Sequence, residues 1–182
     1  MVFLFFIRFF IRNKKIIVFG AFKNSYADNS RYLFEQCDKE LSDYDCVWIT
    51  SSKSIRSKLK AQNMKSAYRW SIRGVFLCLR AKYYVYNSYV SDINFWFSRR
   101  AVFVNLWHGI PLKKIEFDIS EGPLKKVYQP KNELISKIIN PIPYQRPSYM
   151  FAPSNYVAKL FQSAFRVEKK ISYVLDILEQ TI

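Results

Sequence analysis

The feature that most constrains the fold is a set of short apolar runs, separated by segments with helical character. Runs of this length are typical of buried strands. Strands that alternate with helices predict βαβ units and therefore a parallel sheet. We expect an α/β, Rossmann-like parallel sheet with flanking helices. The predicted strands are Lys15–Phe22, Cys46–Thr50, Lys82–Tyr86, Ala101–Asn105 and Tyr149–Ala152.

Capping residues and apolar periodicity place helices between these strands. Asp28 or Asn29 is the predicted N-cap of the helix after the first strand, and Ser51–Ser52 and Ser154 are predicted to cap later ones. Prolines limit helix length in Phe117–Pro147, which is either a surface excursion or a flap over an acceptor or a membrane. The predicted helices are Asp28–Leu41, Lys53–Gln62, Arg69–Arg80, Ser120–Tyr128, Glu133–Ile139 and Tyr156–Phe165.

The run Ala101–Asn105 leads into a loop that carries the single histidine of the chain, His108. A strand end that opens into a loop is where α/β proteins usually place their chemistry. Histidine is the side chain whose unperturbed pKa suits proton transfer near neutrality. Lys113 and Lys114 follow closely, and ammonium groups bind phosphate as compact charges. Taken alone, His108 is either a loop histidine bonded to the backbone or a base beside a phosphate.

The formal net charge of +15 indicates a polyanionic partner, which is nucleic acid, an anionic lipid surface or a phosphate-rich polymer. No acidic residue stands between Asp45 and Asp92, and the basic residues of that interval, here called the basic run, form either solvated helix surface or a docking face. The three cysteines lack CxxC spacing and no glycine-rich nucleotide motif is present, so we expect no zinc site and no cofactor. The basic run comprises Lys53, Arg56, Lys58, Lys60, Lys65, Arg69, Arg73, Arg80 and Lys82.

The first residues, Met1–Ile11, are strongly apolar but too short to span a bilayer, which needs about 20 apolar residues. They also lack the charged start and cleavage site of a secretory signal. Arg8, Arg12 and Lys15 fall at helical spacing, which predicts either an interfacial helix in the headgroup region or an ordinary buried first element. The predicted divisions are 1–14, a possible interfacial segment, and 15–182, a single Rossmann-like domain.

Three segments carry longer motifs. Asn105–Ile115 reads NLWHGIPLKKI, Lys15–Leu33 reads KIIVFGAFKNSYADNSRYL, and Phe151–Phe165 reads FAPSNYVAKLFQSAF. In their order along the chain, these segments resemble the CDP-glycerol glycerophosphotransferase family of teichoic-acid primases and polymerases, which has a Trp-His-Gly-x-Pro-Leu-Lys core after a strand. The family then continues through a Gly-x-Pro-Arg-x-Asp-like stretch into a nucleotide-binding domain, whereas Val167–Ile182 departs from that pattern.

The resemblance implies a two-lobed GT-B-type fold of which this chain is the N-terminal, acceptor-facing half, truncated before the nucleotide-binding domain. It implies transfer of glycerol phosphate from a CDP-glycerol-type donor to a hydroxyl of a lipid-linked saccharide or a polyol-phosphate chain, in teichoic-acid or related cell-surface polymer synthesis. The donor site would lie largely in the missing domain. The expected location is the cytoplasmic face of the cell membrane, as a peripheral protein on an anionic surface.

The resemblance also assigns roles to individual residues. His108 is the predicted base that takes the acceptor proton, and Lys113 and Lys114 match the motif lysines that would steady phosphate groups. Asp118 resembles an acidic position of the family and is a candidate to orient the imidazole.

Asn24 and Ser154 follow the first and last predicted strands, so they would open on the same sheet edge as His108. There they either bond donor or acceptor groups or simply cap helices.

Three classes of function remain after the sequence is read. The first is a glycerophosphotransferase, as a partial enzyme, with glycerol or another polyol such as ribitol in the donor. The second is a non-catalytic protein that binds a membrane or an anionic polymer through Met1–Ile11 and the basic run. The third, nucleic-acid binding, is permitted by the charge but has no recognition motif, so we predict no nucleic-acid partner.

Overall fold

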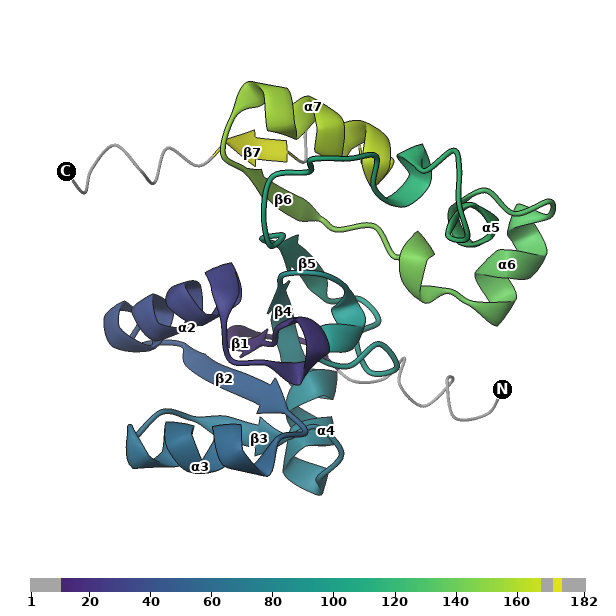
Figure 1. Cartoon of the computed structure of the whole chain (residues 1–182). Coiled ribbons are helices and arrows are strands. Elements are labelled where there is room, and N and C mark those ends of the chain that lie inside the picture. The colour runs from purple at the N-terminus through teal and green to yellow at the C-terminus, as the bar shows by residue number, and fades with distance from the viewer. Residues whose placement is uncertain (1–10, 168–171, 175–182) are drawn as a thin grey trace.

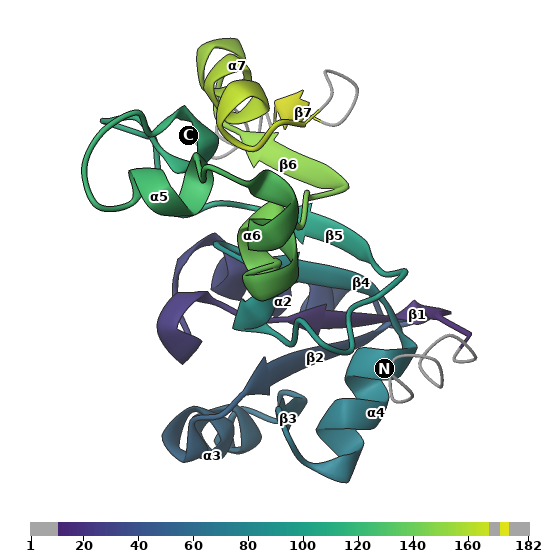
Figure 2. The same cartoon turned by 90° about the vertical axis from the view of Figure 1, so that its right-hand side faces the viewer.

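Among the residues that the structure describes, seven parallel strands form one sheet in the order β3-β2-β1-β4-β5-β6-β7. The computed structural model describes residues 11–167 and 172–174. Figure 2 shows the strands stacked in this order, from β3 near the bottom to β7 near the top. The predicted α/β class with a parallel sheet is confirmed. The strands are β1 (Asn13–Phe19), β2 (Asp45–Thr50), β3 (Ser66–Tyr68), β4 (Ala81–Tyr86), β5 (Val102–Asn105), β6 (Tyr149–Ala152) and β7 (Ser172–Val174).

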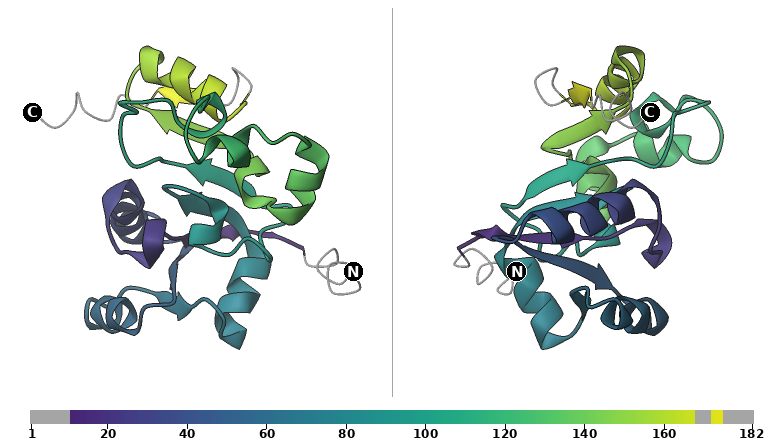
Figure 3. Two further views of the ribbon diagram at one scale, coloured as in Figure 1. Left: turned by 45° about the vertical axis from the view of Figure 1, so that its right-hand side comes forward. Right: turned by 90° about the vertical axis from the view of Figure 1, so that its left-hand side faces the viewer.

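The face of the sheet that a helix covers depends on the direction in which the chain crosses from one strand to the next. The chain runs from β1 outward to β3 and then crosses to β4 on the other side of β1. Because crossovers between parallel strands are right-handed, α2 and α3 lie on one face and α4 and α7 on the other (Figures 1 and 3). The helices are α2 (Asp28–Glu40), α3 (Lys53–Ala61), α4 (Ile72–Arg80), α5 (Lys125–Tyr128), α6 (Glu133–Ile139) and α7 (Asn155–Ala164), with 3-10 turns η2 (Phe22–Asn24), η3 (Val90–Asp92), η4 (Glu116–Asp118) and η5 (Ile142–Tyr144).

Side chains of β1 alternate between two cores. Ile16 and Val18 belong to the apolar cluster on the α4 side, whereas Ile17 and Phe19 belong to the cluster that contains Phe34 of α2. A strand buried on both faces reads as a continuous apolar run, because neither set of alternating side chains meets water. This is why the β1 sequence is recognisable without any polar alternation.

Serine side chains start two helices as the sequence predicts. Ser52 Oγ accepts a hydrogen bond from the backbone N–H of Ile55 at 3.3 Å, and Ser154 Oγ accepts one from Val157 at 3.2 Å. Each bond satisfies an N–H group that has no partner inside the helix. Both predicted caps are confirmed.

The predicted cap of α2 is wrong. The N-cap position is Ala27, which makes no side-chain cap bond, and Asp28 is already the first residue of the helix. The side chains of Asp28 and Asn29 reach instead to neighbouring loops. The helix start is therefore set by contacts across the sheet edge rather than by a local cap.

Two short strands, β3 and β7, are absent from the sequence prediction. β3 sends only Ala67 into the core, so no apolar run marks it. The helix α4 also begins three residues later than predicted, at Ile72 rather than Arg69. The reason is that Ser71 Oγ accepts a hydrogen bond from Gly74 N at 3.0 Å and caps the helix there.

The segment between β5 and β6 projects from the sheet as an excursion made of η4, α5, α6 and η5 (Figure 1). Its helix α6 has the predicted bounds. The other predicted helix, from Ser120, shrinks to the four residues of α5 because Gly122 has a φ of +76° and Pro123 follows it. Asp118 of η4 accepts a hydrogen bond from Ser163 Oγ of α7 at 2.7 Å, which ties the excursion to the domain.

Arg12 is partly buried, which agrees with the alternative of an ordinary first element of the fold and not with that of an interfacial helix. Its guanidinium is committed to backbone carbonyl oxygens near the ends of α4 and β4 and in the loop before β5, so it is not available to a membrane surface. Residues 1–10 lie outside the described part, and the division at residue 14 stays a prediction. In the part of the chain that the structure describes, no helix is long and apolar enough to cross a bilayer. The carbonyl acceptors belong to Cys78, Ala81, Phe97 and Arg99.

Candidate active site

The C-terminal ends of β1, β4, β5 and β6 are neighbours at one edge of the sheet. The loop after β1 contains Asn24, the loop after β5 contains His108, and the loop after β6 contains Ser154. The strand order reverses between β1 and β4, and ligands of open α/β sheets bind at such a switch point. The topology therefore gathers three of the predicted site residues along one edge.

His108 is exposed and its imidazole is held by aromatic rings rather than by hydrogen bonds. The ring stacks on Trp107, with centroids 4.4 Å apart and planes at 24°, and lies 6.0 Å from the ring of Phe22 at 19°. No described residue forms a hydrogen bond with either ring nitrogen. The reading of His108 as a histidine bonded to the backbone does not fit this geometry, and both nitrogens are available to a substrate.

Trp107 holds the loop in a strained conformation. Its φ of +49° lies in the left-handed region, which a non-glycine residue adopts at a cost of about 1 kcal/mol or more. Two asparagines fix the peptide: Asn105 Oδ1 accepts from Trp107 N at 2.8 Å, and Asn29 Nδ2 donates to Trp107 O at 3.0 Å. The indole is buried against Phe161 and Phe165. Strain that is over-determined in this way is typical of functional sites.

Asn87, directly after β4, joins the loop of β1 to the start of α2. Its Oδ1 accepts from Phe22 N at 2.8 Å, and its Nδ2 donates to Asp28 Oδ2 at 3.0 Å. Gly20 permits the close packing of η3 against the end of β1, because a Cβ there would lie 2.8 Å from the carbonyl oxygen of Asp92. The sequence did not predict a role in the site for Asn29, Asn87 or Phe22. The available signal was a polar residue immediately after the buried run that forms β4.

The predicted phosphate-binding lysines lie beside the histidine loop on exposed backbone. Lys113 forms no hydrogen bond or ion pair with a described residue, and Lys114 Nζ donates to Ser120 Oγ at 3.2 Å. Asp118 accepts from Ser163 rather than from the imidazole. A role of Asp118 in orienting His108 is therefore not supported by its contacts, and the phosphate roles of the lysines stay predictions.

Asn24 and Ser154 both make structural bonds at the edge. Asn24 Oδ1 accepts from Thr50 Oγ1 at 2.8 Å and from Ser51 N at 2.7 Å, so it links η2 to the end of β2. Ser154 Oγ is occupied by its cap bond to Val157. Ser154 therefore matches the helix-capping alternative, whereas Asn24 fixes a loop and caps no helix.

A buried carboxylate supports the loops next to the switch point. Asp92 Oδ2 accepts from the N–H groups of Ser88 and Tyr89, at 3.0 and 3.1 Å. Burial raises the pKa of Asp92 to about 6, although the two backbone N–H donors and Arg69 act in the opposite direction. Arg69 was predicted to lie on a helix surface. Its guanidinium instead donates to the carbonyl oxygen of Asp92, so Arg69 does not belong to the exposed surface of the basic run.

A second buried carboxylate, Glu116, follows the histidine loop. The hydroxyl of Tyr89 donates to Glu116 Oε1 at 2.6 Å and lies 2.6 Å from the hydroxyl of Tyr128. Burial raises the pKa of Glu116 and of Tyr89, and raises that of Tyr128 to about 12. Glu116 has a φ of +49°. This cluster braces the far end of the loop that carries His108.

Within residues 11–167 and 172–174 there is no group of three or more His, Cys, Asp or Glu side chains that could hold a metal ion. The three cysteines are free.

Curated relatives of known activity are similar to most of this chain. A teichoic acid poly(glycerol phosphate) polymerase of Bacillus spizizenii is 27% identical over 165 residues, and a teichoic acid glycerol-phosphate transferase of Staphylococcus aureus is 30% identical over 164 residues. The matches cover 87% and 86% of this chain but only 39% of each relative. The chain thus spans about two fifths of the length of these relatives.

Solved structures show the same fold. The wall teichoic acid polymerase TagF superposes with a TM-score of 0.67 at 20% identity, over 88% of this chain and 38% of that one. A TagF variant soaked with CDPG gives a TM-score of 0.69 over 90% of this chain. The family described as CDP-glycerol:poly(glycerophosphate) glycerophosphotransferase matches residues 1–174. Because that match extends over nearly the whole chain, the protein belongs to the CDP-glycerol glycerophosphotransferase family.

Proposed function

We propose that this chain provides the acceptor side of a glycerophosphotransferase. The observation that carries the proposal is the exposed imidazole of His108, whose nitrogens bond to no described residue, on a strained loop close to the switch point of the sheet. The names of the curated relatives support a CDP-glycerol-type donor and a teichoic-acid-type acceptor. The acceptor would be a lipid-linked saccharide or a polyol-phosphate chain.

In this mechanism His108 takes the proton of the acceptor hydroxyl. The acceptor oxygen attacks the glycerol-bearing phosphorus of CDP-glycerol, a new P–O bond forms, the bond to the CMP oxygen breaks, and CMP leaves. The Trp107 and Phe22 rings fix the plane of the imidazole, which reduces the number of unproductive orientations. Lys113, exposed five residues after His108, would stabilise charge on the phosphoryl oxygens.

The donor nucleotide would be held mostly by the part of the relatives that this chain does not match. The chain covers 39% of the length of the Staphylococcus aureus relative. Correct placement of the two substrates supplies a large share of catalysis. The acceptor half alone is therefore expected to show weak transfer activity or none.

The test is transfer of radiolabelled glycerol phosphate from CDP-glycerol to a membrane fraction. The native chain and His108→Asn are assayed alone and fused to the remaining region of the Staphylococcus aureus relative. We expect His108→Asn to lower transfer by about 10²–10⁴-fold, the range of a positioned general base. Arg56→Gln, a change of an exposed residue on α3, is the control and should leave transfer unchanged.

Each outcome of that assay has a definite meaning. Activity of the short chain would place the donor contacts among its own residues, and activity only in the fusion would identify it as the acceptor half. No transfer in either form would favour the alternative, a binding protein without chemistry. Equal activity of the native chain and His108→Asn would refute the base assignment.

We further propose that α4 contacts an anionic lipid surface at the cytoplasmic face of the membrane. Trp70 and Phe76 are each 52% exposed and Ile72 is 93% exposed, and Arg73 lies among them. Leu77, on the other side of α4, is buried in the core. Exposed apolar side chains beside basic ones are typical of interfacial helices.

Vesicle pelleting tests this second proposal. Phe76→Glu should weaken binding to phosphatidylglycerol vesicles, whereas Tyr32→Glu, which changes an exposed aromatic residue on α2, should not. Ile138→Glu, on the exposed apolar side of α6, measures whether α6 and not α4 makes the contact. Competition by a single-stranded oligonucleotide at constant salt would favour nucleic-acid binding instead.

A further inference from the structure

A pocket of about 190 Å³ lies in the excursion, and His108 is not among its lining residues. It is bounded by η4, α6, η5 and the C-terminal end of α7, segments that lie side by side on one side of the sheet (Figures 1 and 2). Three basic side chains and one carboxylate contribute to its wall, together with two aromatic rings. The lining residues are Phe117, Glu133, Lys137, Tyr144, Arg146 and Arg166.

The charges in this pocket do not balance. A single oxygen, Glu133 Oε1, accepts from Lys137 Nζ at 2.9 Å and lies 3.2 Å from Arg166 Nη1. The hydrogen bond from Lys137 lowers the pKa of Glu133, so this carboxylate is ionised at neutral pH. Arg146 forms no hydrogen bond or ion pair with any described residue. One negative charge therefore faces three positive charges.

Aromatic rings hold the cations in place. The guanidinium of Arg166 lies over the Phe117 ring at 4.1 Å, and Lys137 Nζ lies over the Tyr144 ring at 5.5 Å. The two rings pack on each other with centroids 5.4 Å apart. Cation–π contacts of this kind restrict long flexible side chains before any ligand arrives, which lowers the entropic cost of binding.

The hydroxyl of Tyr144 is a second, independent indication of a ligand. Its oxygen is buried and has no hydrogen-bond partner among the described residues, and the residue itself is one of those that line the pocket. Unsatisfied buried hydroxyls are rare because each one costs free energy. A ligand oxygen in the pocket would satisfy it.

We propose that this pocket is an anion site that binds a phosphate group. Arginine presents paired N–H donors that match phosphate oxygens, and the lysine and tyrosine add further donors around the same space. Phosphate binding stands on the pocket alone. That the phosphate belongs to a phosphodiester-linked polyol chain, held by the pocket while its end is extended elsewhere, rests on the proposed function.

The experiment is an NMR titration of the isotope-labelled native chain with inorganic phosphate, glycerol 3-phosphate and a soluble glycerol phosphate oligomer, at constant ionic strength. Arg146→Gln is expected to weaken phosphate binding by about tenfold, the loss of a charge-assisted hydrogen bond. Tyr144→Phe should weaken it by about threefold. The control Arg56→Gln removes the same charge from α3 and should bind like the native chain.

Equal phosphate affinity in the native chain, Arg146→Gln and Tyr144→Phe would overturn the site. Tighter binding of the oligomer than of glycerol 3-phosphate would support the polymer as its ligand, and equal or weaker binding would contradict that assignment. The titration needs no turnover. The absence of transfer activity would therefore contradict only the proposed function and would not affect the proposed anion site.

Discussion

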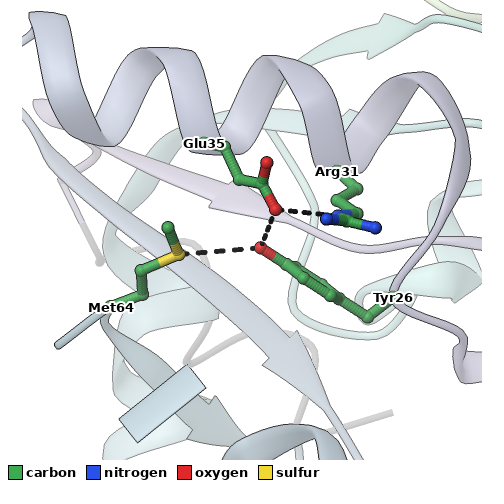
Figure 4. Close-up of polar contacts among 4 residues, drawn as sticks. All are labelled: Tyr26, Arg31, Glu35 and Met64. Carbon is green, nitrogen blue, oxygen red and sulfur yellow. Dashed lines mark hydrogen bonds and ion pairs between the residues drawn. The ribbon is translucent and has the colours of Figure 1, made fainter. Parts of the chain in front are cut away.

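Two regions that both contact α2 use aromatic and polar side chains in opposite ways. At the start of the helix, Asn29 supports the strained Trp107 peptide, and the neighbouring imidazole of His108 stays exposed. Further along the helix, Tyr26 and Glu35 form a closed cluster with Arg31 and Met64 (Figure 4).

In the closed cluster every charge has an internal partner. Glu35 Oε1 accepts from Tyr26 at 2.9 Å and from Arg31 at 2.7 Å, and the Tyr26 ring packs edge-on against Trp48 at 4.8 Å. Arg31 lowers the pKa of Glu35 chiefly through its hydrogen bond. The cluster has no free group for chemistry, so it serves the fold. At the other region only the backbone is satisfied, which leaves the imidazole for a substrate.

The largest expected effect comes from Trp107→Ala. The buried indole packs on two phenylalanines, and removal of such a ring costs about 3–5 kcal/mol of unfolding free energy. Transfer should be lost as well, because His108 loses its stacking partner. Chemical denaturation measures the first effect. Trp96→Ala, at a half-exposed position, is the control; an equal loss there would show that the loop is not specially supported.

Asp92→Asn tests the buried support beneath the site. The native pKa of about 6 lies above the usual 3.8, so the folded state holds the proton that the unfolded chain releases as pH rises. The contribution of Asp92 to the stability of the native chain should therefore fall between pH 3.8 and about 6, by up to about 3 kcal/mol. In Asp92→Asn this fall should be absent. Parallel stability profiles of the variant and the native chain would contradict the assignment.

Asn29→Ala removes the link between α2 and the histidine loop. The amide donates to the carbonyl oxygens of Leu106 and Trp107, and its loss should cost about 1 kcal/mol in stability. Transfer should fall by about tenfold or more, because a displaced His108 would be poorly positioned to take the acceptor proton. Gln36→Ala, on the same helix, should change neither quantity appreciably. Unchanged transfer in Asn29→Ala would show that the start of α2 does not support the histidine loop more than the closed cluster does.

Glu35→Gln should have the smallest effect. A partly exposed ion pair contributes less than about 1 kcal/mol, and transfer should be unchanged. The pKa of Glu35 is lowered in the folded chain, so its contribution is present above the usual value of 4.5 and is lost as pH falls. Thermal unfolding at pH 7 and pH 3 should therefore show a difference between variant and native chain only at pH 7. A drop in transfer would mean that the closed cluster also serves the site.

Local sequence determined the elements with strong local signals. The runs at β1, β2, β4, β5 and β6 are recognisable because strands buried on both faces need continuous apolar residues. Ser52 and Ser154 predicted their helices because a cap bond spans only three residues. The Trp-His-Gly motif located His108, and its place at the sheet edge follows from strand direction alone.

The tertiary structure decided everything that depends on residues distant in the sequence. Asn87 and Asn29 became supports of the site only when the ends of β4 and β5 met the start of α2. The sequence placed Arg69 on the surface and left Arg12 either interfacial or buried. Both side chains are committed to carbonyl oxygens of distant segments. A hydrogen bond between segments tens of residues apart leaves no local pattern, because its partners are neighbours only after the strands have paired.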